Sequence, residues 1–253
     1  MAKIVFITGA TSGFGKACAE KFAAEGWNLL LNGRRADRLE EINKSLSAKY
    51  PSCQIHLLPL DVRDQAIVFQ TIQGLPDAWK KIDLLVNNAG LALGRDYFDE
   101  ADLEDWNTMI DTNVKGLLYV SKAVIPFMIE NKKGHIINIG STAAKEVYEK
   151  GNVYCASKHA VEAISEAMRI DLLRHGIKVT AIHPGAAETE FSTVRFKGDQ
   201  QMADKVYEGF TPLYAPDVAE VIYYCTTLPP HVCINDLVLT ATAQANSFYF
   251  HKQ

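Results

Sequence analysis

The sequence predicts a single-domain α/β fold over residues 1–253: a Rossmann-like, doubly wound parallel sheet flanked by helices. Two observations support this prediction. Short apolar runs recur along the chain with helical stretches between them, and the first run leads directly into a glycine-rich turn. Such alternation is typical of parallel sheets, because each parallel crossover needs a returning segment, usually a helix. The strand-like runs are residues 3–8, 27–32, 55–60, 83–87, 134–140, 177–183 and 234–240.

The first strand, its turn and the following helix predict a site for a pyrophosphate. Residues 3–8 are followed by glycines in a Gly-x3-Gly-x-Gly pattern and by a helix expected from about residue 16 to 25. Glycines let the backbone approach a phosphate closely, and the start of a helix offers free N–H groups and a positive dipole end. The residues expected to bind the cofactor here are Gly9, Thr11, Ser12, Gly13, Phe14 and Gly15.

The second strand, residues 27–32, predicts which cofactor is used. Folds that prefer NAD usually place an acidic side chain after this strand to hold the ribose 2′-hydroxyl. This chain instead has Arg34 and Arg35, and no carboxylate before Asp37. Because a guanidinium suits a 2′-phosphate, we expect NADP(H).

The long helix after the fifth strand contains a predicted proton-transfer pair, Tyr154 and Lys158. Residues four apart share one face of a helix, so the Lys158 ammonium can lie beside the Tyr154 ring and lower the pKa of the phenol. Ser141, thirteen residues upstream, can hydrogen-bond the same substrate oxygen. Core-facing residues continue along this helix at spacings of three and four, and Gly176 is placed to end it. The core-facing residues are Val161, Ile164, Met168 and Leu172.

Composition limits the other functional classes. The net charge is −4 and 48% of residues are hydrophobic, so neither nucleic acid nor an anionic membrane is an expected partner. Five scattered cysteines without a Cys-x-x-Cys pair fit reduced thiols in the cytoplasm. No run approaches the length of a membrane span, and the dispersed histidines show no metal-binding spacing.

Several motifs in order resemble the short-chain dehydrogenase/reductase family. They are Thr-Gly-x3-Gly-x-Gly at 8–15, Asn-Asn-Ala-Gly at 87–90, Asn113, Ser141, Tyr154-x3-Lys158 and the Pro184-Gly185 turn. The resemblance implies an oxidoreductase in which Tyr154 is the acid/base and Lys158 lowers its pKa and holds the nicotinamide ribose. It also implies that Ser141 positions the carbonyl, that Asn113 steadies a water-linked proton path, and that the protein is a homotetramer. Further cofactor contacts implied by the family pattern are Asp61, Val62, Asn88, Gly90, Pro184, Gly185 and Thr189.

Within that family, residues 86–94, 109–113, 135–143 and 189–199 are similar to the NADP-dependent 3-hydroxy acid dehydrogenases, whose close relatives include sulfoacetaldehyde reductases. The resemblance implies a short aldehyde or alcohol substrate that bears an acid group. Residues 145–147 and the tail, 244–253, depart from this branch, so carboxylate and sulfonate substrates are both open. We expect residues 186–210 to form the substrate loop, with Arg195 pairing with the acid group. The other candidate substrate residues are Ser141, Tyr148, Gln244 and Tyr249.

The aromatic tail would be costly to leave exposed, so we expect it to pack on a subunit interface. Two alternative functions stay open at this point. One is a reductase of bulkier neutral ketones, and the other is a non-catalytic NADP sensor. The second is disfavoured because all four expected catalytic residues are present.

Overall fold

A computed structural model of the chain, which describes residues 2–253, contains a seven-stranded sheet with the order β3-β2-β1-β4-β5-β6-β9. All neighbouring strands pair in parallel. The predicted fold class is therefore confirmed, and all seven predicted strands are found. Their bounds are Ile4–Ile7 (β1), Asn28–Gly33 (β2), Ile55–Pro59 (β3), Ile82–Asn87 (β4), Gly134–Ile139 (β5), Ile177–Pro184 (β6) and Asp236–Leu239 (β9).

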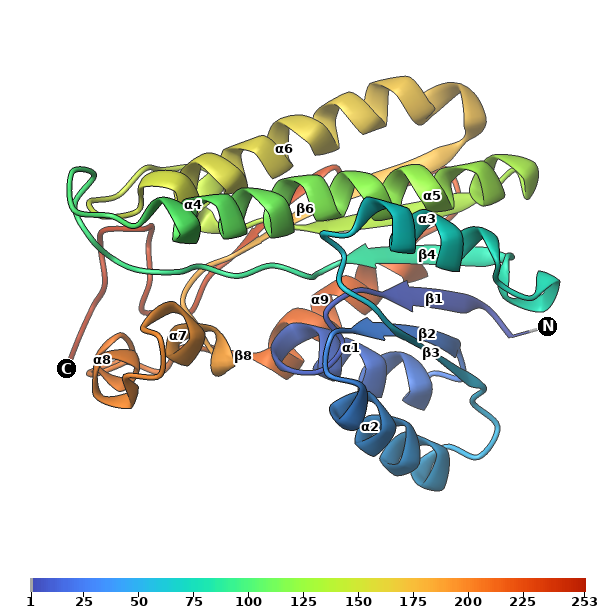
Figure 1. Ribbon diagram of the computed structural model, residues 1–253, viewed down its shortest axis with the longest axis horizontal. Helices are drawn as coiled ribbons and strands as arrows, with labels where there is room; N and C mark the ends of the chain where they lie inside the picture. Colours follow the sequence, from blue (N-terminus) through green and yellow to red (C-terminus); the bar gives the residue numbers. More distant parts are fainter. Residues whose placement is uncertain (1) are drawn as a thin grey trace.

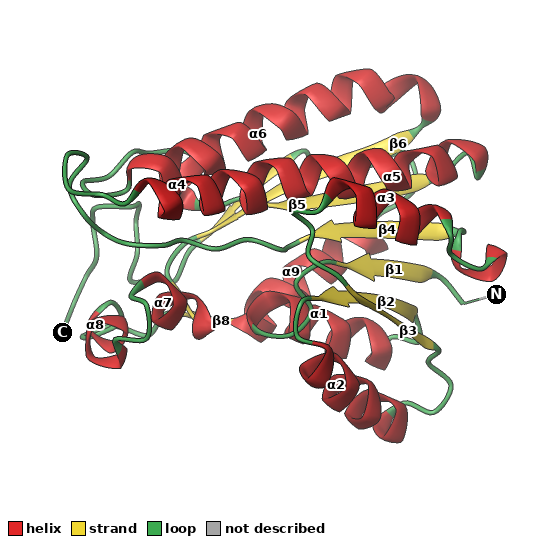
Figure 2. Cartoon of the chain, viewed as in Figure 1, coloured by secondary structure: helices red, strands yellow, loops and turns green. Residues whose placement is uncertain are grey.

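Helices cover both faces of the sheet (Figures 1 and 2). One face carries α1 (Gly13–Ala24), α2 (Ala36–Lys49) and α9 (Ala215–Thr227). The other carries α3 (Gln65–Gln73), α4 (Leu103–Ile110), α5 (Leu117–Glu130) and α6 (Asn152–Leu172), with a π-helical segment, Asp111–Gly116, joining α4 to α5. Short 3₁₀ turns lie at Asp77–Trp79, Thr142–Ala144 and Leu173–His175. Among the described residues, no helix combines the length and the apolar character needed to cross a bilayer.

Helix α1 begins three residues before the expected start, because Ser12 already has the extended backbone of a helix-preceding residue. Later in the chain, Gly176 has φ of 67° and ends the 3₁₀ turn that follows α6, as predicted. Only glycine adopts such a left-handed conformation at little cost.

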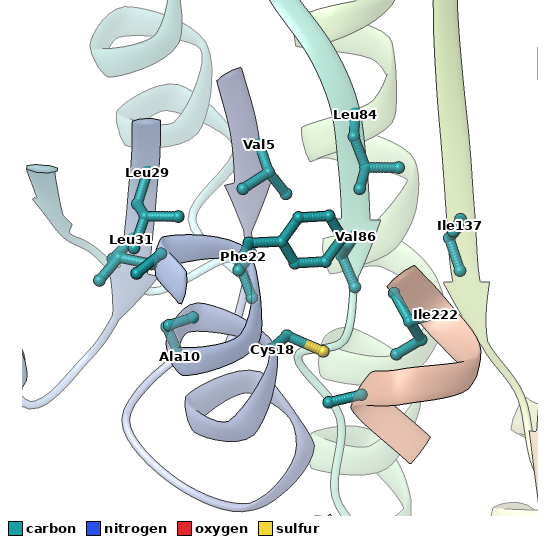
Figure 3. Packing of buried hydrophobic residues seen from close by; sticks show 14 of the residues in the cluster. Val5, Ala10, Cys18, Phe22, Leu29, Leu31, Leu84, Val86, Ile137 and Ile222 are labelled. Carbon is teal, nitrogen blue, oxygen red and sulfur yellow. The ribbon is translucent and has the colours of Figure 1, made fainter. Parts of the chain in front are cut away.

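The core consists of one apolar layer on each side of the sheet. Figure 3 shows Phe22 of α1 among Val5, Leu84 and Val86 of the central strands. Its ring is fully buried and meets Trp27 edge-on, with 5.0 Å between ring centroids. Burial of apolar side chains on both faces explains why β1 and β2 are nearly continuous hydrophobic runs, since a parallel sheet leaves neither face exposed to water.

Beyond the carboxyl ends of the strands, the chain forms a small outlying unit (Figure 1). It contains a two-stranded pair, β7 (Ala187–Glu188) with β8 (Leu213–Tyr214), and the short helices α7 (Glu190–Arg195) and α8 (Gln200–Lys205). The strand order reverses between β1 and β4, and in open α/β sheets ligands bind at such a switch point, outside the carboxyl ends.

The C-terminal tail folds onto this outlying unit of its own chain. Gln253 N–H donates to Gly209 O at 2.8 Å, and the rings of Phe210 and Phe250 lie 5.1 Å apart. These contacts are made within one chain, and the packing of the tail on a subunit interface stays a prediction. Tyr249 still points outward and is 72% exposed.

Candidate active site

A cleft of about 820 Å³ runs along the carboxyl ends of the strands and under the outlying unit. Its wall combines the glycine-rich turn, the ends of β2 to β6, helix α7 and the tail. A cavity of this size is within the usual range for small-molecule and cofactor sites. Most of the predicted site residues line it.

The glycine-rich turn presents a free helix start to the cleft. Gly9 and Gly13 have φ of 67° and 50°, in the region that favours glycine. Ser12 precedes α1 without a side-chain capping bond, and the first turn of α1 contains no acidic residue. The N–H groups of this turn are therefore available to an anion. Gly15 does not line the cleft; a Cβ there would lie 2.3 Å from Gly9 O, so this glycine serves close packing.

The basic turn after β2 lies beside this helix start. Arg35 donates from Nη2 to Thr11 Oγ1 at 3.1 Å and to Ser12 Oγ at 3.3 Å. Arg34 is more exposed and lies 3.9 Å from Asp61 Oδ2. Two guanidinium groups next to a helix start give this end of the cleft a positive character.

Behind the turn, Asn88 fastens β4 to β1. Its Nδ2 donates to Thr8 O at 2.8 Å, and its backbone N–H donates to Thr8 Oγ1 at 3.0 Å. A Cβ at Gly90 would lie 3.2 Å from Asn113 Oδ1 and 3.7 Å from Lys158 Nζ, so the backbone comes close to both side chains. The predicted residues Val62, Pro184, Gly185 and Thr189 also line the cleft.

Asn113 lies one layer behind the cleft wall rather than on it. It sits in the π-helical segment between α4 and α5, a local irregularity that is common at functional sites. Its side chain accepts from Leu91 N–H at 2.8 Å and donates to Leu91 O at 2.8 Å and Ser157 Oγ at 3.0 Å. Both of its N–H donors and one lone pair of its Oδ1 are thus used in holding the segment after β4 against α6.

Tyr154, Ser141 and Lys158 come together at the middle of the cleft. Ser141 follows β5, while Tyr154 and Lys158 occupy one face of α6, as predicted. Burial raises the pKa of the Tyr154 phenol above its usual range, and the Tyr148 hydroxyl adds to this effect. The Ser141 hydroxyl, through a hydrogen bond, and the Arg195 charge act in the opposite direction but do not outweigh it.

The expected effect of Lys158 on Tyr154 is not seen in this structure. Lys158 Nζ donates to Ile139 O at 2.9 Å and lies 5.9 Å from the centroid of the Tyr154 ring. The Lys158 ammonium thus bonds to the carbonyl at the end of β5 and not to the Tyr154 phenol. Burial lowers the pKa of Lys158 to about 8. The net pKa of Tyr154 is raised, opposite to the direction expected from the four-residue spacing alone.

Arg195, at the end of α7, reaches over the tyrosines. Its guanidinium carbon lies 5.4 Å from the ring centroid of Tyr154 and 5.5 Å from that of Tyr148. Nη1 donates to Tyr148 Oη at 3.0 Å, and Nε donates to Gly94 O at 3.4 Å. A positive charge is therefore fixed next to the phenol, in a partly buried position.

The two predicted tail residues have different outcomes. Gln244 lies at the cleft but is 4% exposed, and its Oε1 accepts from Ala186 N–H at 2.8 Å. It supports the turn after Pro184-Gly185 instead of offering a free amide. Tyr249 does not reach the cleft, because alternate residues of the tail face opposite ways: Phe248 and Phe250 line the cleft and Tyr249 points outward. The structure therefore does not place Tyr249 at this chain's own cleft, and its role as a substrate residue stays a prediction.

Sequence reasoning missed two contributors. Phe191 packs on Tyr154 with 5.6 Å between ring centroids. Glu190 accepts from Arg38 Nη1 at 2.9 Å and lies 3.5 Å from Arg35 Nη1, linking the loop to the basic turn. The Glu190–Phe191 pair next to Thr189 was visible in the sequence, but the partners of Glu190 lie more than 150 residues away in the chain, and Phe191 meets Tyr154 from a different element.

A cleft with a phosphate-binding turn at one end and a buried phenol at the other is built for nucleotide-dependent oxidation and reduction. The chain belongs to the short-chain dehydrogenase family, since the family model described as short chain dehydrogenase matches residues 3–200. The family expected from the motifs is thereby confirmed.

Individual members of the family are similar to this chain over nearly its whole length. The chain is 48% identical to Sulfoacetaldehyde reductase 2 of Chromohalobacter salexigens over 250 residues, covering 98% of each protein. It is 45% identical to NADP-dependent 3-hydroxy acid dehydrogenase YdfG of Escherichia coli (strain K12) over 243 residues, covering 96% of each. Among solved structures, the closed form of serine dehydrogenase complexed with NADP+ matches with a TM-score of 0.91 at 45% identity, covering 99% of this chain and 100% of that one.

Proposed function

We propose that this protein is an NADP(H)-dependent oxidoreductase that reversibly reduces a short aldehyde bearing an acid group to its alcohol. The substrate pair is sulfoacetaldehyde and isethionate, or malonic semialdehyde and 3-hydroxypropionate with related 3-hydroxy acids and serine. The observation that carries the proposal is the placement of Arg195 over Tyr154, 5.4 Å from the ring centroid. Relatives named for sulfoacetaldehyde and for 3-hydroxy acids support the same substrate class.

The chain's residues fit NADP(H) at the phosphate end of the cleft. The start of α1 has neither a side-chain cap nor an acidic first turn, which suits a pyrophosphate. Arg35, held by the hydroxyls of Thr11 and Ser12, is oriented for a 2′-phosphate, and Arg34 adds a second cation. When bound, the nicotinamide supplies the hydride.

The protein's part in the reaction is to place the carbonyl and to move a proton. We assign Tyr154 as the donor of a proton to the substrate oxygen and Ser141 as a second hydrogen-bonding group on that oxygen. Asn113 holds the backbone of Leu91 and the hydroxyl of Ser157 at the base of α6. Lys158 donates to Ile139 O in this structure and lies close to Gly90. We assign it to hold the nicotinamide ribose and to lower the pKa of Tyr154 when the cofactor is bound.

The acid group of the substrate would lie between Arg195 and the reacting carbonyl. A guanidinium forms strong charge-assisted hydrogen bonds with either a carboxylate or a sulfonate. Arg195 is oriented by Tyr148 and by Gly94 O, so part of the ordering cost is met before substrate arrives. A two- to three-carbon chain would then bring its carbonyl near Tyr154.

The test is NADPH oxidation, followed by absorbance, with sulfoacetaldehyde, malonic semialdehyde and uncharged propanal, and with NADH as the cofactor control. We expect NADPH and one of the acidic aldehydes to give the highest kcat/KM. Tyr154→Phe should remove nearly all activity while leaving NADPH binding intact. Equal activity on propanal and on bulky ketones would instead support a reductase of neutral ketones.

We further propose that the enzyme is a cytoplasmic homotetramer with residues 186–210 as its substrate loop and without nucleic-acid or membrane partners. Leu173 and Ile170, near the end of α6, are 75% and 74% exposed, which suits contact with a second copy. A monomer by multi-angle light scattering would contradict the assembly. Protection of the loop from proteolysis by NADPH and substrate together would support its assignment.

A further inference from the structure

His183 occupies a closed position directly behind the catalytic serine. It is the residue before Pro184 at the end of β6, and its side chain is 0% exposed. The ring packs so closely on the end of β5 that a Cβ at Gly140 would lie 2.3 Å from His183 Nδ1. A change in the position of this ring would therefore displace Gly140 and Ser141, which follows it.

The two ring nitrogens face opposite partners. Nδ1 lies 3.4 Å from Ser141 N and 3.2 Å from Ser141 O, so it can accept from the N–H or donate to the carbonyl, but not both. Nε2 lies 2.7 Å from Asp236 Oδ1 at the start of β9. A nitrogen lone pair that close to a carboxylate oxygen would be repelled, so Nε2 carries the proton in the neutral ring.

The protonation state of the His183 ring thus determines whether Nδ1 bonds to the N–H or to the carbonyl oxygen of Ser141. In the neutral ring, Nδ1 is an acceptor and takes the Ser141 N–H. In the protonated ring, Nδ1–H is a donor and must turn to the Ser141 carbonyl, which leaves the Ser141 N–H without this acceptor. The two states hold the peptide that carries the catalytic hydroxyl in different ways.

Three charged groups face this ring from the elements packed against it. They are Asp236 of β9, Lys145 after the 3₁₀ turn Thr142–Ala144, and Glu162 of α6. Lys145 Nζ pairs with Glu162 and lies 2.6 Å from Asp236 Oδ2. Glu162, His183 and Asp236 have a spacing that would suit a metal ion, but the Lys145 ammonium already supplies the cation between the two carboxylates.

We propose that His183 is a positioning residue for the reaction: its neutral ring accepts from the Ser141 N–H and holds the serine hydroxyl at the substrate oxygen, while Asp236 and Lys145 set its charge state. The proposal rests on the proposed function, in which Ser141 contacts the reacting oxygen. Asp236 is 43% exposed and gives protons from water a route to the pair. Burial favours the neutral ring by lowering the pKa of His183, and Asp236 opposes this effect.

Acid should therefore lower kcat by protonating His183, which gives the pH profile of kcat an acidic limb. Removing the charge of Asp236 or of Lys145 should shift this limb in opposite directions. Asp236→Asn removes the charge that favours the imidazolium, so the limb should shift to lower pH. Lys145→Met removes the charge that disfavours it, so the limb should shift to higher pH. His183→Asn offers an oxygen acceptor near the position of Nδ1 and does not titrate, so it should flatten the limb and keep substantial kcat at neutral pH.

The experiment measures kcat and KM for NADPH-dependent reduction between pH 5 and 8 in these variants, with sulfoacetaldehyde, whose charge is constant over this range. His135→Asn is the matched control, because His135 is also buried, at the opposite end of β5, where it contacts Thr180 Oγ1 at 2.7 Å. We expect its pH profile to match that of the wild type. An unchanged limb in His183→Asn, or shifts of the same sign in Asp236→Asn and Lys145→Met, would overturn the proposal.

An NMR titration separates failure of this inference from failure of the proposed function. In the wild-type protein with NADP+ bound and no substrate, the His183 ring signal and the Ser141 amide signal should titrate together. This readout needs neither turnover nor a variant that folds. If the two signals titrate at different pH values, or the Ser141 amide does not respond, the positioning role is excluded even where the enzyme is active.

Discussion

Arg195 and Tyr154 form a stacked pair across the cleft, with the guanidinium carbon 5.4 Å from the phenol ring centroid, although 41 residues separate them in the chain. One comes from a short helix of the outlying unit and the other from the longest helix of the sheet layer. In the proposed reaction this pair links recognition of charge to proton transfer, because the group proposed to attract an acidic substrate lies next to the group proposed to protonate it.

This geometry predicts a selective effect of Arg195→Gln. A charge-assisted hydrogen bond contributes about 1.5 to 3 kcal/mol, so KM for an acidic aldehyde should rise about 10- to 100-fold. KM for propanal should change little, since an uncharged substrate does not use the guanidinium. Steady-state kinetics with both substrates measures the difference, and Arg195→Lys should recover part of the loss by restoring the charge. An equal loss for both substrates would show that Arg195 only supports the fold of the loop.

Arg35 should determine the choice between NADPH and NADH. Arg35→Ser removes the guanidinium held by Thr11 and Ser12, so the dissociation constant for NADPH should rise about 10-fold or more, while that for NADH stays nearly constant. Fluorescence titration with both cofactors gives the two constants. Lys44→Gln, an exposed change on α2, is the matched control for loss of one positive charge. Equal weakening of both cofactors would argue against a 2′-phosphate site here.

Glu190 and Arg38 should act together in holding the substrate loop. Arg38 Nη1 lies 2.9 Å from both carboxylate oxygens of Glu190, the first residue of α7. Partly exposed ion pairs contribute about 0.2 to 1 kcal/mol, so Glu190→Arg should raise KM for the aldehyde by a factor of about two to five. The double variant Glu190→Arg with Arg38→Glu should restore the wild-type KM. Losses that simply add in the double variant would rule out coupling between the two residues.

The sequence predicted the fold and most of the cleft because those features depend on local signals. Apolar runs, glycine spacing and the positions of Arg34 and Arg35 are each readable within a few residues. The differences from the structure arose where the direction of a side chain depended on contacts that the sequence pattern does not show. The Lys158 ammonium turned to Ile139 O, the Gln244 amide was taken by Ala186 N–H, and Tyr249 faced outward. Hydrogen bonds to residues 19 and 58 positions away orient Lys158 and Gln244, and the alternation of the tail turns Tyr249 outward.

Lys158 gives the last prediction, in which stability and function oppose each other. Its ammonium is buried and its pKa is lowered to about 8, from an ordinary value of 10.5. Between about pH 8 and 10.5 the unfolded chain therefore binds more protons at this residue, so its contribution to stability rises with pH across this window. Below pH 8 the burial of the Lys158 ammonium lowers the free energy of unfolding by its full amount, at most about 3 kcal/mol.

Lys158→Met should accordingly inactivate the enzyme and yet stabilise the protein without cofactor at pH 7. The hydrogen bond to Ile139 O is lost at a cost of about 1 kcal/mol, so the net gain should be about 1 to 2 kcal/mol. Urea denaturation at pH 7, 8 and 9 measures the difference from the wild type, which should shrink as pH rises. Lys44→Met, an exposed lysine, should show no such trend. A variant less stable than the wild type at pH 7 would mean that Lys158 is stabilised as an ammonium, and that its charge is available to the Tyr154 phenol even before cofactor binds.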